Sequence, residues 1–454
     1  MAKRHGIDLG KMRELHERER ADFLARRPRA RALAGQSARH LLFGVPLHWM
    51  DDWPTPSPLF VAEAQGAQLT DVDGHRYVDF CLGDTGAMFG HSPAPVAAAI
   101  ARESARGLTA MLPGEDALWV AEALAQRFGL PVWQFALSAS DANRFAIRWA
   151  RAATGRDQIL VFNGCYHGTV DDVFVDLEEG QAKPRASLLG QVYPLTEHTR
   201  VVEFNDLAAL ERALSDGRVA CVLAEPAMTN IGMVLPDPDY WQQAQAIIRR
   251  HGSLLLLDET HTISCGPGGF TALHGLRPDL LVLGKPLAGG LPAAAYGFSA
   301  ELAARAQQAK RDAPAGHSGI GATLSANRLS CAAMRANLAE VMTDDAYQIM
   351  FERAAQLERG LRELFVRFDL PWCVSRLGAR CEFQFVPRPP RNGSEAAAGQ
   401  DAELEQSIHL YLLNRGLLIT PFHNMLLLSP HTTAQDVDRL LAVFDQWLRA
   451  VRMA

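Results

Sequence analysis

The chain is 454 residues long, 48% of its residues are hydrophobic, and its formal net charge at pH 7 is -6. A chain of this length and composition can bury a large core, and we expect one large domain together with a smaller one. The acidic balance argues against a general nucleic-acid binder, because phosphate binding depends mainly on Lys and Arg.

The N-terminal stretch, residues 1–35, is rich in Arg and Glu and lacks the apolar run of a signal peptide. Its mixed charges predict a solvated helix or arm, which could lie across a partner subunit. No later apolar run reaches the length of a membrane span. Seven cysteines are spread along the chain without a CxxC pair, which is typical of reduced thiols and gives no zinc site. We therefore expect a cytoplasmic protein that binds neither membrane nor nucleic acid.

Residues 59–80 contain the turn signal Asp73-Gly74 between apolar runs, which predicts a small antiparallel hairpin. Short apolar runs then alternate with segments long enough to hold helices, such as ANRFAIRWARAATG and DPDYWQQAQAIIRRHG. This alternation predicts an α/β fold around a mainly parallel, buried central sheet. The predicted strands of that sheet span residues 134–137, 158–162, 220–225, 254–258 and 280–284.

The pattern changes near residue 330. A long helical stretch is followed by short strands around CEFQFVP, a Pro/Gly-rich loop RPPRNGSEAAAGQD, and a closing helix AQDVDRLLAVFDQWLRAV. This order predicts a smaller α+β domain. We therefore divide the chain into an N-terminal arm with the hairpin, residues 1–75, a large domain, residues 76–330, and a small C-terminal domain, residues 331–454.

Polar residues gather at the carboxyl ends of the predicted strands, where sheets of this kind bind ligands. SASDAN follows the first strand and NGCYHGT follows the second, while Glu225, Asp258 and Lys285 stand at the ends of the other three. The SAS segment opens a helix, and the free N–H groups and dipole of a helix start favour a phosphate. Ser and Asp are also ordinary N-caps, so this segment alone is a weak signal.

Lys285 stands between Gly284 and Pro286, directly after an apolar run. By itself, such a lysine is most simply a strand-end residue that reaches solvent. A partly buried amine, however, is less readily charged and becomes a nucleophile toward carbonyls. An amine, a phosphate cradle, a buried carboxylate and an aromatic residue at neighbouring strand ends together predict a site for pyridoxal 5'-phosphate.

The segments named above resemble the class III, or ω-, aminotransferase family of fold-type I pyridoxal-phosphate enzymes. Within that family the chain is most similar to the branch that contains glutamate-1-semialdehyde aminomutase and the β-amino-acid aminotransferases. The resemblance spans roughly residues 35–445 and is carried by SASDANRFAIRWAR, GCYHG, AEPAMTNIGMVLP, LLLLDETHT, LGKPLAGGLPAAAYG and GATLSANRL. It implies a large domain with a mainly parallel sheet, a smaller α+β C-terminal domain, and a homodimer with shared active sites.

The resemblance implies catalytic roles for Lys285, Asp258 and Tyr166. The lysine would form the Schiff base and move the Cα proton, the aspartate would pair with the protonated ring nitrogen, and the tyrosine would stack on the ring. Glu259 points the other way by strand alternation and is expected to be structural. Thr323 would reach the phosphate of the neighbouring subunit. The residues with implied cofactor-binding roles are Ser138, Ala139, Ser140, Tyr166, His167, Glu225, Asn230, Asp258, Thr260, His261, Lys285 and Thr323.

Two positions depart from the family pattern beside the aspartate. The family commonly has valine where this chain has Thr260, and glutamine or methionine where it has His261. His261 could hydrogen-bond the ring hydroxyl, or it could be a polar residue simply satisfied at a strand end. A metal site made by Asp258, Glu259 and His261 would lack a second cluster of ligands, so we expect no metal.

The same resemblance suggests substrate contacts at Arg39, Asp84 and His423. Arg39, in GQSARHLLFG, corresponds to an arginine that holds a substrate carboxylate, and the alternative is one more surface arginine in a basic stretch. The active-site tryptophan of the aminomutase is replaced near Gly83-Asp84, and its C-terminal glutamate has no counterpart in ITPFHNMLLLSP, which contains His423. These replacements favour a transaminase over an aminomutase.

The sequence therefore predicts a pyridoxal-phosphate-dependent aminotransferase that uses a Lys285 Schiff base. It would move an amino group from an amino acid, including a β-amino acid, or an amine to a keto acid or aldehyde. The first alternative is a glutamate-1-semialdehyde-type 2,1-aminomutase, which isomerises one substrate without a second. The further alternative is a protein that binds the cofactor without catalysis.

Overall fold

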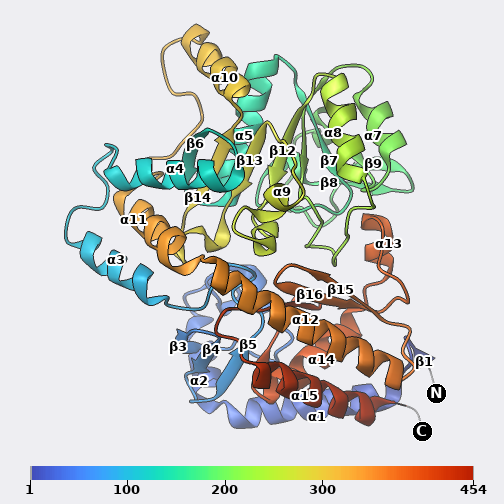
Figure 1. Ribbon diagram of the computed structural model, residues 1–454. Helices are drawn as coiled ribbons and strands as arrows, with labels where there is room; N and C mark the ends of the chain where they lie inside the picture. The colour runs from blue at the N-terminus through green and yellow to red at the C-terminus, as the bar shows by residue number, and fades with distance from the viewer. Residues whose placement is uncertain (1–2, 453–454) are drawn as a thin grey trace. The chain divides into compact units, whose positions relative to one another are not determined.

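The computed structural model describes residues 3–452, and the chain divides into two compact units (Figure 1). Unit 1 contains the chain up to residue 93, residues 345–389, and the chain from residue 399 onward. Unit 2 contains residues 94–344 and 390–398. Unit 1 therefore combines the N-terminal segment with segments from near the C-terminus. The domain boundaries after residues 75 and 330 stay a prediction.

Unit 2 is built on a seven-stranded sheet in which β14 runs antiparallel to both of its neighbours and the other paired strands are parallel. The predicted α/β fold with a mainly parallel sheet is therefore confirmed. Two strands of this sheet were not predicted from the sequence. Strand β10 is a short edge strand, and strand β14 contains a glycine. In spatial order the strands are β10 (Thr199–Val202), β7 (Gln158–Phe162), β11 (Val219–Ala224), β12 (Leu254–Asp258), β13 (Leu280–Leu283), β14 (Ala294–Phe298) and β6 (Val132–Ala136).

The two faces of this sheet are covered by different helices. Residues of α5 (Ala139–Thr154) and α10 (Ala300–Asp312) join Leu254 and Leu256 of β12 in one apolar cluster. On the opposite face, Phe162 of β7 contacts the ring of Tyr240 in α8 (Tyr240–Arg250). Because side chains alternate along a strand, Asp258 shares the α5 face with Leu254 and Leu256.

Further helices and one hairpin complete unit 2. The hairpin pairs β8 (Val175–Glu178) with β9 (Gln181–Pro184). The segment predicted as a Pro/Gly-rich loop contains a short helix, α13 (Gly393–Ala398), so that expectation was wrong for these residues. The remaining α-helices of the unit are α3 (Ala94–Ser104), α4 (Glu115–Phe128), α6 (Leu195–His198), α7 (Leu207–Leu214), α9 (Gly269–Leu273) and α11 (Arg328–Ala336).

In its described residues, unit 1 holds a two-stranded sheet of β1 (Lys3–Arg4) and β2 (Ile7–Asp8) and two larger sheets. The predicted hairpin at residues 59–80 is in fact three antiparallel strands, because a second turn at Gly66, with φ of 57°, precedes the one at Asp73-Gly74. A strand from near the C-terminus extends this sheet in parallel. One sheet runs β17 (Leu417–Leu418), β5 (Arg76–Asp79), β4 (Gln68–Asp71) and β3 (Val61–Gln65), and the other runs β15 (Cys373–Leu377), β16 (Arg380–Gln384) and β18 (Met425–Leu427).

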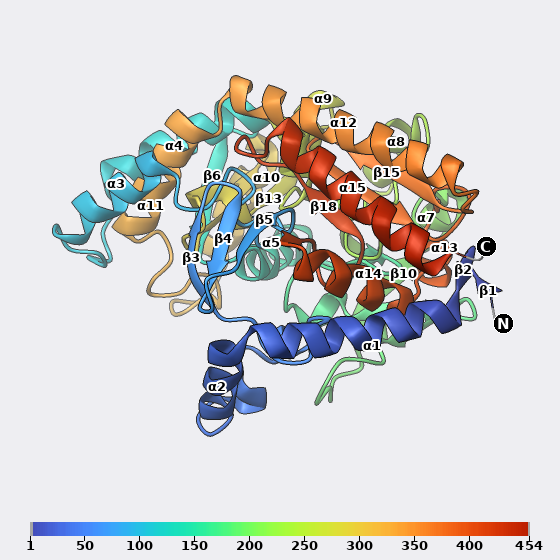
Figure 2. The ribbon, with the colours of Figure 1, turned by 90° about the horizontal axis from the view of Figure 1, so that it is seen from below.

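The N-terminal helix α1 (Leu9–Arg26) is not a freely solvated arm, because one of its faces is buried against α14 (Ala402–Asn414) and α15 (Ala434–Val451), as Figure 2 shows. Helix α15 matches the predicted closing helix. The single long helix expected after residue 330 is interrupted: α11 ends in a π-helical turn, Asn337–Val341, before α12 (Asp344–Arg367) begins. Shorter elements at the N-terminus are β1 (Lys3–Arg4), β2 (Ile7–Asp8) and α2 (Pro28–Ser37).

Candidate active site

The start of α5 lies against the segment that follows β13. The backbone of Gly284 approaches it so closely that an added Cβ would lie 2.8 Å from Cβ of Ala139 and 3.3 Å from its backbone nitrogen. Lys285 follows directly, with a left-handed φ of 41°, at the start of the short 3-10 helix Lys285–Ala288. Such a backbone conformation is costly for a non-glycine residue and is most often found where function requires it. Glycine at 284 thus brings the lysine next to a helix N-terminus.

The turn after β7 lies against the same helix start. An added Cβ on Gly168 would lie 2.1 Å from Oγ of Ser140, and this hydroxyl accepts a 3.0 Å hydrogen bond from the N–H of Thr169. Ser138 is the N-cap of α5 and accepts from the N–H of Asp141. The first N–H groups of a helix have no intrahelical acceptor, so this junction of three segments is suited to a phosphate.

Asp258, at the end of β12, is buried in a hydrogen-bond network. Its Oδ2 accepts from Nδ2 of Asn143 at 2.8 Å and from Nδ1 of His167 at 3.0 Å, and its Oδ1 accepts from the N–H of Thr260 at 3.1 Å. Burial by itself raises the pKa of Asp258, but the bond and positive charge of His167, with the bonds from Thr260 and Asn143, lower it below its usual range. Asp258 is therefore a buried carboxylate that stays ionised.

His167 is the charged partner in this network. Burial by itself lowers the pKa of His167, but the hydrogen bond to Asp258 and further interactions with Cys165 raise it above the usual range of an imidazole. Glu225, at the end of β11, is also buried, which raises its pKa, and the charge on His167 offsets that rise in part. The carboxylate of Glu225 accepts from Oγ1 of Thr229 at 2.5 Å and from Nδ2 of Asn230 at 3.5 Å.

Glu259 points away from this network, as strand alternation predicts. Its carboxylate accepts hydrogen bonds from the N–H groups of Phe270 and Thr271 in the first turn of α9, and from the hydroxyl of Thr262. Burial raises the pKa of Glu259, and these bonds offset the rise in part. The expectation that Glu259 is structural therefore agrees with its contacts.

Lys285 and His261 meet across the ends of β13 and β12. Nζ of Lys285 lies 2.7 Å from Nε2 of His261, within hydrogen-bond distance. The histidine is buried and the lysine is half-buried. Tyr166, which is 39% exposed, leaves a large part of its side chain open to a ligand.

Buried polar atoms without hydrogen-bond partners lie among the residues around Asp258, and they bear on whether these residues fit pyridoxal phosphate. Within residues 3–452, three buried polar atoms of this region have no hydrogen-bond partner: Oδ1 of Asn143, Nε2 of His167 and Oγ1 of Thr260. Buried polar atoms are usually satisfied, so such a cluster indicates a polar ligand. The ionised Asp258 suits a protonated ring nitrogen, and the start of α5 suits a phosphate. The donor set therefore fits the cofactor.

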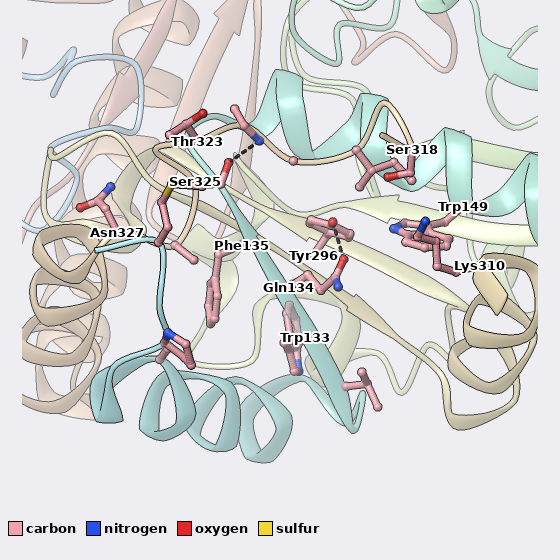
Figure 3. Close-up of a pocket in the computed structure, with 18 of the residues that line it drawn as sticks. Trp133, Gln134, Phe135, Trp149, Tyr296, Lys310, Ser318, Thr323, Ser325 and Asn327 are labelled. Carbon is pink, nitrogen blue, oxygen red and sulfur yellow. Dashed lines mark hydrogen bonds between the residues drawn. The ribbon is translucent and has the colours of Figure 1, made fainter. Parts of the chain in front are cut away.

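Thr323 is not part of this cluster within one chain. It is exposed on a loop that lines a cavity of about 890 Å³ in unit 2. Figure 3 shows Thr323, Ser325 and Asn327 on one side of this cavity and Trp149 with Lys310 on the other. The cavity lining includes neither Lys285 nor Asp258. A role for Thr323 at a phosphate site would therefore require a second subunit, as the sequence analysis expected.

The three predicted substrate residues lie in unit 1. Nδ1 of His423 is 2.8 Å from Oε1 of Glu382. Burial by itself lowers the pKa of His423, but the charges of Glu382, Asp84 and Glu405 raise it above the usual range, so the half-buried Asp84 lies near enough to act on the buried His423. Arg39 follows the end of α2 and is exposed.

Asn143 is the residue of this site that the sequence analysis missed. Its Nδ2 donates both to Asp258 and to the backbone carbonyl of His167, at 3.1 Å, so it ties α5, β12 and the turn after β7 together. The signal was present in the sequence, because Asn143 lies on the apolar face of α5 among Ala142, Ala146 and Ile147. An amide on such a face needs a buried partner.

The chain is similar to known proteins over most of its length. The model of the family described as Aminotransferase class-III matches residues 49–448. A glutamate-1-semialdehyde 2,1-aminomutase from Anaeromyxobacter sp. (strain Fw109-5) is 34% identical over 392 residues, which cover 85% of this chain and 89% of that protein. Among the described residues, no helix combines the length and apolar character that crossing a membrane requires.

Two solved proteins are also similar. A glutamate-1-semialdehyde-aminomutase from Pseudomonas aeruginosa PAO1 has a TM-score of 0.96 and 50% identity, over 98% of this chain and 99% of that chain. A lysine-to-alanine variant of it in complex with PMP has a TM-score of 0.96 and 49% identity, over 98% and 100% of the two chains. A β-phenylalanine aminotransferase from Variovorax paradoxus has a TM-score of 0.86 and 26% identity, over 96% and 97%.

Proposed function

Because the chain belongs to the class-III aminotransferase family of fold-type I, pyridoxal-phosphate-dependent enzymes, we propose that it is an aminomutase of the glutamate-1-semialdehyde type. Such an enzyme moves an amino group from carbon 2 to carbon 1 of one substrate. The observation that carries the proposal is the likeness to the Pseudomonas aeruginosa aminomutase, which spans nearly the whole chain at half identity. This reverses the order of preference reached from the sequence, which placed an aminotransferase first.

Several residues of unit 2 would hold the cofactor. Asp258, kept ionised by His167, would pair with the ring nitrogen, and the start of α5 with Ser138, Ala139 and Ser140 would bind the phosphate. Pyridoxal phosphate, when bound, supplies an electron sink for the carbon that loses its proton. Tyr166 would offer its exposed ring for stacking. Glu225 and Asn230 remain proposed neighbours of the ring.

The chain's own contribution to the reaction is the handling of protons. Nζ of Lys285 would hold the cofactor between turnovers and would move protons: carbon 2 loses a proton as it gives up the amino group, and carbon 1 gains a proton as it receives the amino group. Because the amino group moves between two carbons of one molecule, the substrate must stay bound until the transfer is complete. Arg39, Asp84 and His423 are the proposed substrate contacts, and Arg39→Ala should raise KM for a carboxylate substrate more than it lowers kcat.

We propose a homodimer as the working form. Unit 2 exposes apolar side chains beside the cavity that Thr323 lines, among them Met111 at 79% and Leu112 at 72% exposure. Exposed apolar groups of this size, gathered in one region, commonly mark a contact between proteins. An isologous contact there would bring the Thr323 loop of each subunit to its partner.

The test is product analysis with a single substrate. Purified enzyme is given glutamate-1-semialdehyde with no amino donor or acceptor, and the isomeric amino ketone is measured over time. We expect conversion that continues for many turnovers per subunit. Conversion that occurs only after a keto acid is added would contradict the aminomutase proposal, and an unchanged visible spectrum on adding any amine would exclude catalysis altogether.

An aminotransferase acting between two substrates is the second candidate. It is favoured by His423, Asn424 and Met425, which stand where the resemblance implies a glutamate in the aminomutase, and by the likeness to the β-phenylalanine aminotransferase. A panel of β-amino acids with a keto acid acceptor, scored by appearance of the aminated acceptor, separates this candidate from the first.

A further inference from the structure

We propose that His261 is the proton partner of Lys285, taking a proton from its ammonium group when the amine must react and returning it when the amine is released. The inference rests on the proposed role of Lys285 and goes beyond it, because a residue of the cofactor pocket becomes an acid-base group. In this exchange Lys–NH3+ and neutral imidazole become Lys–NH2 and imidazolium, so the number of protons and the net charge are unchanged.

The geometry of the two side chains carries this proposal. Nε2 of His261 and Nζ of Lys285 are 2.7 Å apart, which is a full hydrogen-bond contact between two groups that can each gain or lose a proton. His261 is 5% exposed and begins the short 3-10 segment after β12, so its ring is held by the fold. The alternatives left open by the sequence did not include this contact.

A hydrogen bond between these two nitrogens needs one proton and one lone pair, so the contact is suited to a single shared proton. Two positive charges 2.7 Å apart in a buried place repel strongly, whereas one proton shared between two nitrogens satisfies both. A pair coupled in this way loses its protons in two separate steps that belong to the pair rather than to either residue. The glutamine or methionine that is common at this position in the family cannot accept such a proton.

The buried carboxylates near this pair accept hydrogen bonds from other protein groups. On β12, Asp258 accepts from His167, while Glu259 accepts from the start of α9. On the segment after β11, Glu225 accepts from Thr229. Each of these groups has a protein partner of its own, and the imidazole of His261 is a base in direct contact with the lysine.

The experiment measures how readily the Lys285 amine reacts as a function of pH. The full-length enzyme is charged with pyridoxamine phosphate, which leaves the lysine uncombined, and is pulsed with acetic anhydride between about pH 5 and pH 10, a range that spans ordinary histidine and lysine titrations. Acetylation of the peptide that contains Lys285 is quantified by mass spectrometry. The variants are His261→Gln and His261→Met, and the matched control is His274→Gln, an exposed histidine of the same unit that stacks on Phe270.

For the wild-type enzyme and the control we expect two inflections with a plateau between them. Both His261 variants should show a single inflection, because no imidazole is left to exchange a proton with the lysine. A single inflection in the wild-type enzyme would overturn the proposal whatever the variants do, as would a plateau that survives in both variants. Aminomutase activity is not the readout, so failure of the proposed reaction would leave this test intact.

Discussion

Asp258 illustrates how a carboxylate can remain charged in a buried place. A single histidine, one amide and one backbone N–H provide the stabilisation that water would otherwise supply. The places of Asp258 and Lys285 at strand ends were predictable, because a charged residue at the end of an apolar strand breaks a simple pattern. The bonding partner of Asn143 and the contact between His261 and Lys285 were not, because both depend on pairing between segments far apart in the chain.

Replacing Asp258 with Asn tests the charge at this position. We expect Asp258→Asn to keep the fold and much of the cofactor binding but to slow removal of the substrate proton by several orders of magnitude, since an uncharged ring nitrogen makes a poor electron sink. The measurement is exchange of the substrate Cα hydrogen in deuterated water, with the thermal unfolding temperature as a control for folding. Near-normal exchange in the variant would show that this carboxylate does not set the rate.

A second prediction concerns Glu405 in unit 1. Burial raises its pKa from 4.5 to about 7, with Glu382 and Asp401 adding to the rise and His423 opposing it. Because the folded state binds this proton more tightly than the unfolded state, the resulting stability is fully present below pH 4.5 and is lost as the pH rises to about 7. A shift of this size corresponds to at most about 3 kcal/mol.

The check compares the wild-type protein with Glu405→Gln, which cannot titrate. We expect the variant to gain stability relative to the wild type as the pH rises from 5 to 8, in denaturant unfolding at both values. The control is Glu301→Gln, at a side chain that is 84% exposed on α10. A stability difference between Glu405→Gln and wild type that is the same at both pH values would show that Glu405 has no raised pKa in the folded protein.

Helices and strands differed in how well the sequence predicted them. The strands β7 and β12 match their predicted bounds, because buried parallel strands are continuous apolar runs between polar residues. The break between α11 and α12 was missed, because the apolar pattern continues through the π-helical turn at Asn337–Val341. Strand β14 was missed as well, since it carries a glycine that packs on Trp133 rather than a run of β-branched residues.

The approach of β13 to α5 yields a prediction for a pair of substitutions. Gly284→Ala should weaken cofactor binding, because its Cβ would lie 2.8 Å from Cβ of Ala139 and push the strand end away from the helix start. The backbone at Gly284 has φ of -148°, so the loss would come from crowding and not from backbone strain. Retention of pyridoxal phosphate after dialysis, read from visible absorbance, is the measurement.

The compensating change is Ala139→Gly, which removes the crowded methyl group. We expect the double variant to recover part of the cofactor binding that Gly284→Ala loses, and Ala139→Gly alone to lose little. Recovery should be incomplete, because the backbone nitrogen of Ala139 is also close, at 3.3 Å. Equal losses in the single Gly284 variant and the double variant would mean that the two segments do not meet in the folded protein.

The molecule as a whole could be assigned to its fold and cofactor class from the sequence, whereas its reaction could not. Six motifs in a fixed order identify the family, but the roles that the resemblance implies for them concern mainly the cofactor and not the substrate. The proposed substrate residues Arg39, Asp84 and His423 lie in unit 1, in segments where the resemblance is short. The proposal of an aminomutase rather than an aminotransferase therefore rests on the likeness of the entire chain to solved proteins.

Assembly provides a prediction for the entire protein. If the apolar surface beside the unit 2 cavity forms the dimer contact, Met111→Asp should yield monomers, since a charge buried in such a contact is costly. Sedimentation equilibrium gives the mass, and cofactor retention shows whether the site depends on the partner. Val366→Asp, at an 82% exposed position of α12, is the control and should leave the mass unchanged. Fully active monomers of Met111→Asp would rule out shared sites.

Unit 1 is built from segments at both ends of the chain, and this affects how it can fold during synthesis. Arg4 bonds to Asp401, which lies 397 residues further along the chain, and β5 pairs with β17. At ordinary translation speeds a ribosome needs roughly 20 to 80 s to cover that distance. Most of unit 2 is one continuous segment, 94–344, and its sheet can form during that time. The apolar face of the nascent helix α1 meanwhile stays uncovered, because α14 and α15, against which it packs, are synthesised last.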